Sequence, residues 1–149
     1  MRYNEYIDIQ TDRSTLYRYL TENKLLLEWM TGLVNVKSRG AKARRKNLKQ
    51  TLSIKDIKGV IEIKEQTLDL LKDEKLSVKW ESEQMEVIMD YGISSNLEGT
   101  VCRLSVDAKI QLQPRFLNFI SFLFAGPIKN QWSRDLSSLK KNIENSSAN

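Results

Sequence analysis

The sequence predicts an α+β domain in which a seven-stranded antiparallel sheet packs against one long C-terminal helix. Residues 100 to 112 alternate apolar and polar side chains, and this period of two is typical of a strand with one buried face. After Pro114, apolar residues recur at steps of three to five as far as about Asn145, which is typical of an amphipathic helix.

The N-terminal quarter predicts one strand followed by two short helices. Residues 3 to 10 alternate in polarity, and Thr11, Asp12 and Ser14 supply short side-chain oxygens that suit a helix N-cap. Apolar residues between 16 and 20 continue the first helix. Those between 25 and 30 form the face of a second helix, which Gly32 can end in a left-handed conformation.

Six further strand-like runs fill the middle of the chain. The segments between them are short and rich in turn-forming residues, which indicates antiparallel hairpins. The runs are 33 to 38, 48 to 57, 60 to 68, 75 to 81, 85 to 94 and 99 to 112.

Length and composition limit the classes of function. With 149 residues, the chain is expected to form a single domain, residues 1 to 149, with a frayed tail at 145 to 149. The sequence has no histidine and one cysteine, Cys102, which is expected to be buried core filler. Imidazole-dependent triads and most zinc sites are thereby excluded, and we expect neither metal nor cofactor. We expect a cytoplasmic protein, because the sequence shows no membrane-spanning apolar run and no signal peptide.

Four segments, taken in the predicted order of elements, match a known superfamily. They are the strand with Ile7 and Ile9 before residues 12 to 20, the stretch "ENKLLLEWM", the tripeptide "IKE" at 63 to 65, and the tail "GPIKNQWSRDLSSLKKNIE". Over nearly the whole chain this arrangement resembles the START-like superfamily, also called SRPBCC or Bet v 1-like. The nearest resemblance is to its polyketide cyclase/dehydrase branch of small bacterial proteins.

The resemblance implies a helix-grip fold, in which the seven-stranded antiparallel sheet curves around the C-terminal helix and two short helices follow the first strand. It also implies a cavity between sheet and helix that often takes a hydrophobic ligand. Because the superfamily includes lipid carriers and coenzyme Q-binding proteins as well as a few cyclases and hydrolases, it implies no particular reaction. We therefore expect binding or transport of a lipid, quinone or polyketide-like compound. The alternatives are a cyclase or dehydratase-type enzyme and a protein-interaction module.

Inward-facing side chains that meet the helix are the candidate cavity residues, although each could simply fill the core. Glu65 is the main candidate for chemistry, since a carboxylate facing an apolar cavity has a raised pKa and can move a proton; Tyr91 is the second. The alternative for Glu65 is a twist or bulge that turns it towards solvent or a lysine. The candidate cavity residues are Trp29, Gln50, Glu65, Trp80, Met89, Tyr91, Phe116, Phe119 and Ile120.

A run of basic residues without an acid forms a candidate site for anionic surfaces. It could contact an anionic membrane peripherally, or it could be a solvated loop. The run has no aromatic residue to stack bases, which argues against nucleic acid. Its basic residues are Lys37, Arg39, Lys42, Arg44, Arg45, Lys46 and Lys49.

Residues 116 to 125 are apolar on nearly every helical face. Phe122 and Phe124 are expected to point away from the sheet. The segment from Phe116 to Phe124 could therefore cover the cavity mouth, form a homodimer contact or dip into a membrane surface. Burial under the two short helices is the alternative.

Overall fold

The computed structural model describes residues 2–56, 59–83, 85–113 and 117–147, except for the side chains of Asp56, residues 117–129 and Ser147. In chain order, the elements are β1 (Arg2–Ile9), α1 (Arg13–Thr21), α2 (Asn23–Trp29), β2 (Leu33–Lys37), β3 (Lys49–Asp56), β4 (Gly59–Leu71), β5 (Lys75–Glu81), β6 (Met85–Ser95), β7 (Cys102–Leu112) and α3 (Leu117–Ser147).

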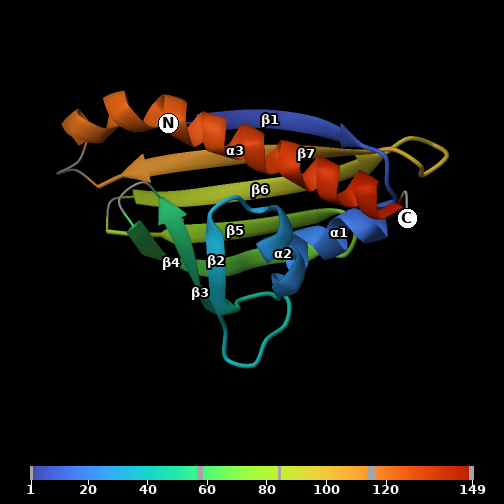
Figure 1. Ribbon diagram of the computed structural model, residues 1–149, viewed down its shortest axis with the longest axis horizontal. Helices are drawn as coiled ribbons and strands as arrows, with labels where there is room; N and C mark the ends of the chain where they lie inside the picture. The colour runs from blue at the N-terminus through green and yellow to red at the C-terminus, as the bar shows by residue number, and fades with distance from the viewer. Residues whose placement is uncertain (1, 57–58, 84, 114–116, 148–149) are drawn as a thin grey trace.

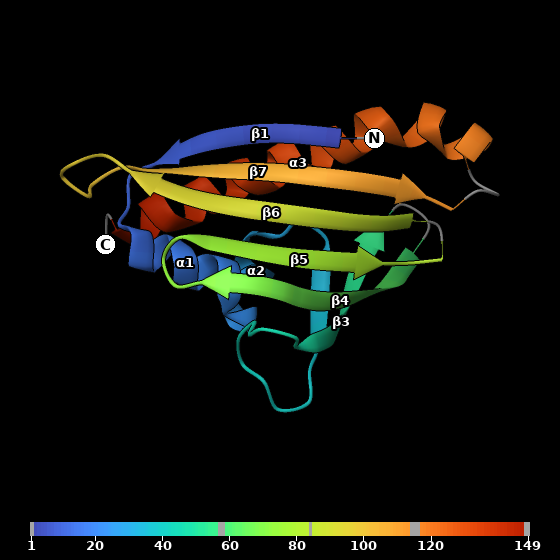
Figure 2. The same cartoon turned by 180° about the vertical axis from the view of Figure 1, so that it is seen from behind.

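The strands form one antiparallel sheet in the order β1-β7-β6-β5-β4-β3-β2. Each strand from β2 to β6 pairs with the next along the chain, and β7 also pairs with β1. The three helices lie on the same face of the sheet, and β2 and β3 turn sharply away from the direction of the other strands (Figures 1 and 2). The predicted fold class is confirmed, including the two short helices after the first strand.

Local chemistry explains how the short helices begin and end. Asp12 caps α1, because its Oδ1 accepts a hydrogen bond from the backbone N–H of Thr15 at 2.7 Å. After α2, Gly32 adopts a φ of +86°, and a Cβ at this position would lie 2.9 Å from the carbonyl oxygen of Lys55. The turn into β2 therefore requires glycine both for its conformation and for its close approach to β3.

The core lies between the sheet and the helices. Along β7 the buried positions alternate with exposed ones, and Leu104 and Ala108 are fully buried. The helix α3 contributes Leu136, Leu139 and Ile143 to the same core. No helix in the described part of the chain is both long enough and apolar enough to cross a membrane.

Candidate functional site

The basic loop between β2 and β3 is anchored to the junction of α1 and α2. The backbone N–H of Asn23 donates to the carbonyl of Lys42 at 2.9 Å, and the N–H of Arg44 donates to the carbonyl of Thr21 at 2.8 Å. An isolated bridge joins Glu22 to Ala43.

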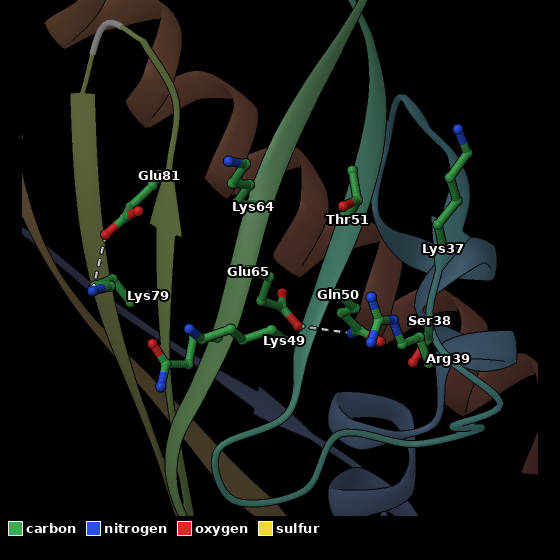
Figure 3. A pocket seen from close by; sticks show the side chains of 11 residues that line it. Lys37, Ser38, Arg39, Lys49, Gln50, Thr51, Lys64, Glu65, Lys79 and Glu81 are labelled. Carbon is green, nitrogen blue, oxygen red and sulfur yellow. Dashed lines mark hydrogen bonds and ion pairs between the residues drawn. The ribbon is translucent and has the colours of Figure 1, made fainter.

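Beside this loop, the outer face of the sheet forms an open groove of about 810 Å³ (Figure 3). The groove is lined by Lys37, Ser38, Arg39, Lys49, Gln50, Thr51, Lys64, Glu65, Gln66, Lys79 and Glu81.

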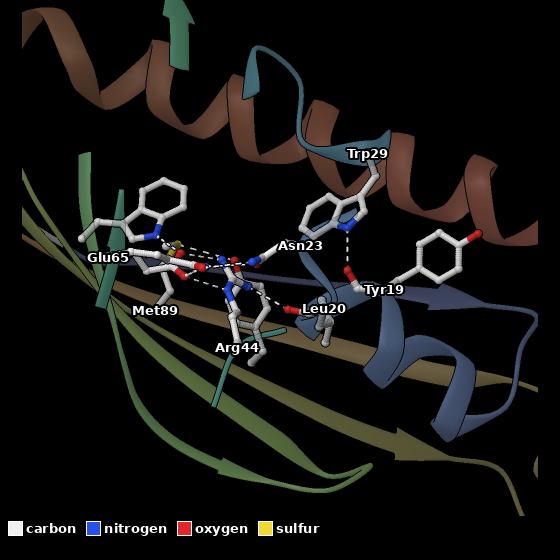
Figure 4. Close-up of polar contacts among 10 residues, drawn as sticks. Tyr19, Leu20, Asn23, Trp29, Arg44, Glu65 and Met89 are labelled. Atoms are coloured by element: carbon white, nitrogen blue, oxygen red, sulfur yellow. Dashed lines mark hydrogen bonds and ion pairs between the residues drawn. The ribbon is translucent and has the colours of Figure 1, made fainter. Parts of the chain in front are cut away.

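Six of the seven predicted basic residues are exposed, and Arg44 is not. Arg44 retains 4% of its accessible surface and points into the interior (Figure 4). Its guanidinium binds Glu65 in a bidentate manner, with Nε 2.9 Å from Oε1 and a terminal nitrogen 2.6 Å from Oε2. A third donor of Arg44 reaches the carbonyl of Leu20 at 2.8 Å. The prediction that Arg44 belongs to an exposed anionic-surface loop is wrong, because this pair takes it into the core.

Two more donors complete the environment of Glu65. Gln50 Nε2 donates to Oε1 at 2.9 Å, and the indole N–H of Trp80 donates to Oε2 at 2.8 Å. Gln50 is held in turn by a reciprocal pair of hydrogen bonds with the amide of Asn23. Burial alone would raise the pKa of Glu65, but the Arg44 charge and these hydrogen bonds lower it below its ordinary value.

Glu65 is therefore ill suited to the proton transfer expected of it. Its two oxygens accept four hydrogen bonds, two of them from a cation, and the carboxylate is held ionised. The alternative expectation, a solvent-exposed Glu65, is also wrong, because the residue is only 1% exposed. The pair instead fastens the loop between β2 and β3 to the inner face of β4.

A small, partly open cavity lies between the sheet and α3. Its free volume, counted for the centre of a water molecule, is about 10 Å³, which is about the room that one water needs. All three tryptophans of the sequence border it, together with Tyr91 and Asp135. The remaining lining residues are Met30, Val106 and Leu136. Of the predicted cavity residues, Trp29, Trp80 and Tyr91 therefore meet at one void.

Asp135 is the one carboxylate that borders this cavity among the described residues, and the sequence did not single it out. Its Oδ1 accepts the backbone N–H of Thr31 at 2.9 Å and the Nε2 of Gln131 at 3.0 Å. Burial raises the pKa of Asp135 to about 6, although both hydrogen bonds act in the opposite direction. Its helical spacing from Trp132 and Leu136, two apolar residues of the inward face, is the signal that could have identified it.

Tyr91 and Met89 lie next to each other on the inner face of β6. The phenol of Tyr91 donates to Met89 Sδ at 3.6 Å. Burial raises the pKa of Tyr91 to about 12, so the phenol stays protonated at neutral pH. Of the other predicted cavity residues, Phe116 lies outside the described residues, as do the side chains of Phe119 and Ile120.

Comparison with known proteins shows the fold alone. No family model matches the chain, and no curated protein matches it. Protein MLL2253 from Mesorhizobium loti is 14% identical over 97% of this chain and 98% of its own, with a TM-score of 0.74. The di-domain ARO/CYC BexL, from the BE-7585A biosynthetic pathway, is 12% identical over 97% of this chain and 46% of its own, also with a TM-score of 0.74.

DynU16, from the dynemicin biosynthetic locus, is 10% identical over 96% of this chain and 47% of its own, with a TM-score of 0.70. The class of structure is thus a seven-stranded helix-grip fold shared with these proteins. At such low identity, the site residues of this chain have to be interpreted from its own geometry.

Proposed function

We propose that this protein binds a small hydrophobic molecule between the sheet and α3, and that the ligand is a lipid, quinone or polyketide-like compound. The observation that carries the proposal is that Trp29, Trp80, Trp132 and Tyr91 meet around one small cavity. Apolar and aromatic linings with few polar groups are typical of small-molecule pockets. The similar structures BexL and DynU16, named for biosynthetic pathways, support it more weakly.

The cavity must widen for such a ligand to enter. A pocket that takes a drug-sized ligand measures roughly 300–1,000 Å³ in total, whereas this void has room for about one water. The tryptophan side chains or α3 must therefore move on binding. A ligand that separates these rings would change the environment of every tryptophan in the chain, so intrinsic fluorescence should report binding directly.

Native mass spectrometry of the purified protein, followed by solvent extraction, tests the proposal. We expect a co-purifying hydrophobic compound, and we expect Val106→Phe to abolish it, because the added ring occupies the space that must open for the ligand beside β7. A circular dichroism spectrum like that of the wild type checks that this overpacked variant is folded. Ile88→Phe is the matched control, since strand alternation places Ile88 on the opposite face of the sheet. A ligand retained by Val106→Phe would contradict binding at this cavity.

A second candidate, a cyclase or dehydratase-type enzyme, rests on Asp135. With its pKa raised to about 6, this carboxyl can accept and return a proton near neutral pH beside an aromatic cavity. We expect Asp135→Asn to retain an unconverted substrate, so that the compound extracted from this variant differs from that of the wild type. The difference is the mass of one water for a dehydration, and a change in chromatographic retention at equal mass for a ring closure. Identical compounds would remove the enzymatic candidate and leave the binding proposal intact.

We also propose that the exposed loop contacts anionic membranes during ligand loading. Lys42, Arg45 and Lys46 project from the loop, and each basic residue near an anionic surface contributes about 1 kcal/mol. Neutralising all three should weaken association with phosphatidylglycerol vesicles by roughly two orders of magnitude. Arg44 must be left unchanged in this test, because replacing it would disrupt the buried pair with Glu65. Unaltered vesicle binding would contradict the membrane contact.

A further inference from the structure

The outer groove lies apart from the cavity. Two of the residues that border it, Gln50 and Glu65, are buried. Strand alternation turns the lysines of β3, β4 and β5 to the opposite, outer face of the sheet. The cationic side chains of the groove come from the end of β2, the following loop and three further strands (Figure 3). They are Lys37, Arg39, Lys49, Lys64 and Lys79.

The lysines stand in rows across the strands. Lys49 of β3 and Lys79 of β5 are the partners of Gln66 in β4, one on each side. Neighbouring strands lie about 4.8 Å apart, so these two lysines leave the backbone about 10 Å apart, with an uncharged amide between them.

The next row repeats this arrangement with a hydroxyl in the middle. Lys37 of β2 and Lys64 of β4 are the partners of Thr51 in β3. Cations held apart along a groove match several anionic groups on one extended molecule better than one small anion, because each group can then meet its own ammonium.

The positive charge of the groove is only partly neutralised by the protein. Lys79 lies 2.9 Å from Glu81, and Lys37 lies 3.5 Å from Glu62. The hydrogen bond and charge of Lys79 lower the pKa of Glu81, and Lys64 and Lys49 lower it further. Within the described residues, three groove cations form no ion pair at all: Arg39, Lys49 and Lys64.

Ser38 adds an unpaired hydroxyl to the groove. It lines the groove, and its Oγ is a buried atom with no hydrogen-bond partner in the described part of the chain. Buried hydroxyls in folded proteins are nearly always paired, but Thr67 Oγ1 on β4 is unpaired in the same way among the described residues, so the Ser38 hydroxyl contributes a donor to the groove without by itself marking a ligand. An acceptor oxygen brought by a ligand would satisfy it after a rotation of the side chain.

We infer that this groove binds a molecule carrying several phosphate groups. Lysine is a common phosphate ligand that acts as a point charge, and the groove combines such charges with hydroxyl and amide groups that can bind phosphate oxygens. Its volume of about 810 Å³ is within the range of small-molecule sites. Because the groove and the cavity lie on opposite faces, this inference does not depend on the proposed hydrophobic ligand.

Isothermal titration calorimetry with sodium tripolyphosphate at low salt tests the inference, with orthophosphate as the single-phosphate comparison. We expect saturable binding of tripolyphosphate that is much tighter than that of orthophosphate. The double variant Lys49→Gln/Lys64→Gln should weaken it roughly 5- to 30-fold, since each exposed charge contact is worth up to about a factor of five. Lys24→Gln/Lys141→Gln is the matched control, because it removes the same net charge from exposed positions on α2 and α3.

A variant that is expected to strengthen tripolyphosphate binding makes the test sharper. Glu81→Gln removes the carboxylate that forms an ion pair with Lys79, so it should strengthen tripolyphosphate binding about twofold to fivefold. The inference is overturned if the wild type shows no saturable binding of tripolyphosphate. It is also overturned if Lys49→Gln/Lys64→Gln and the control Lys24→Gln/Lys141→Gln lose the same amount of affinity.

The source of the phosphates is decided by repeating the series with phosphoinositide vesicles. If the protein binds both tripolyphosphate and the vesicles, and both depend on Lys49 and Lys64, the ligand is a lipid headgroup. If it binds tripolyphosphate but not the vesicles, the ligand is a soluble phosphorylated compound.

Discussion

Two carboxylates, Glu65 on β4 and Asp135 on α3, are both buried, but their pKa values shift in opposite directions. Glu65 is 1% exposed and Asp135 is 7% exposed, so both lose most of their hydration. Glu65 gains a guanidinium and two neutral donors in exchange, and its pKa falls. Asp135 gains two neutral donors, with no ion pair among the described residues, and its pKa rises to about 6.

This difference separates a structural role from a functional candidate. A carboxylate whose lone pairs and charge are all satisfied is committed to the fold and has no capacity left for a ligand. A carboxylate that is poorly compensated can gain from a ligand that brings a hydrogen-bond donor or a positive charge. The sequence pointed to Glu65, whose hydrogen bonds and charge are already satisfied within the fold. It did not point to Asp135 on α3, the carboxylate that a ligand can still stabilise.

The largest expected effect comes from breaking the buried pair on one side. Glu65→Ala leaves the Arg44 guanidinium buried without its partner, and such changes cost roughly 3–5 kcal/mol. Urea denaturation should therefore show a strongly lowered midpoint, or an unfolded protein. Asp8→Asn serves as the control. It breaks a bidentate Arg103 contact of similar geometry on the exposed face of β1 and β7, and it should cost far less.

The double variant Arg44→Met/Glu65→Leu keeps this prediction testable if the single variant does not fold. Removing both charges avoids the stranded guanidinium, so the double variant should be more stable than Glu65→Ala. The folded pKa of Glu65 is lowered, so the stability contributed by the pair is present above the unfolded pKa and is lost as the pH falls. A Glu65→Ala protein as stable as the wild type would mean that the pair does not hold the loop.

Asp135→Asn should have a smaller effect than Glu65→Ala, and it should raise the free energy of unfolding instead of lowering it. The folded pKa of about 6 lies above the ordinary value of 3.8, so the wild type loses stability as the pH rises between these values. A shift of about two units corresponds to roughly 3 kcal/mol, and the variant should be more stable than the wild type by up to this amount at pH 8. The difference in urea midpoint should vanish below about pH 4. A difference independent of pH would show that Asp135 does not titrate in this range.

The arrangement of strands and helices was predictable because it depends on local patterns. The alternation in residues 102 to 112 and the N-cap at Asp12 are each visible within a short window of sequence, and both are found in the structure. Gly32 was recognisable for the same reason, since a helix that ends in a residue of positive φ favours glycine there.

The partners of buried charges were not predictable, because they are set by contacts between distant segments. Arg44 stands in a run of seven basic residues, and nothing within that run distinguishes it from its exposed neighbours. Its burial depends on Glu65, which lies 21 residues away along the chain and becomes a neighbour only when β4 pairs with β3. In the same way, Asp135 meets Thr31 across 104 residues, through the docking of α3 on the turn after α2.

Tyr91→Phe should give the smallest effect and sharpens the comparison between the two carboxylates. The charges of both Glu65 and Asp135 raise the pKa of Tyr91, yet the phenol donates to Met89 Sδ rather than to either of them. Sulfur is a weak acceptor, so removing the hydroxyl should cost less than about 1 kcal/mol in urea denaturation. A neutral phenol also adds no charge to its surroundings, so the pH range over which Asp135 titrates should stay the same. A shift of that range in the variant would instead mean that Tyr91 donates to Asp135 in solution, and the two residues would then form a single acid–base unit at the cavity.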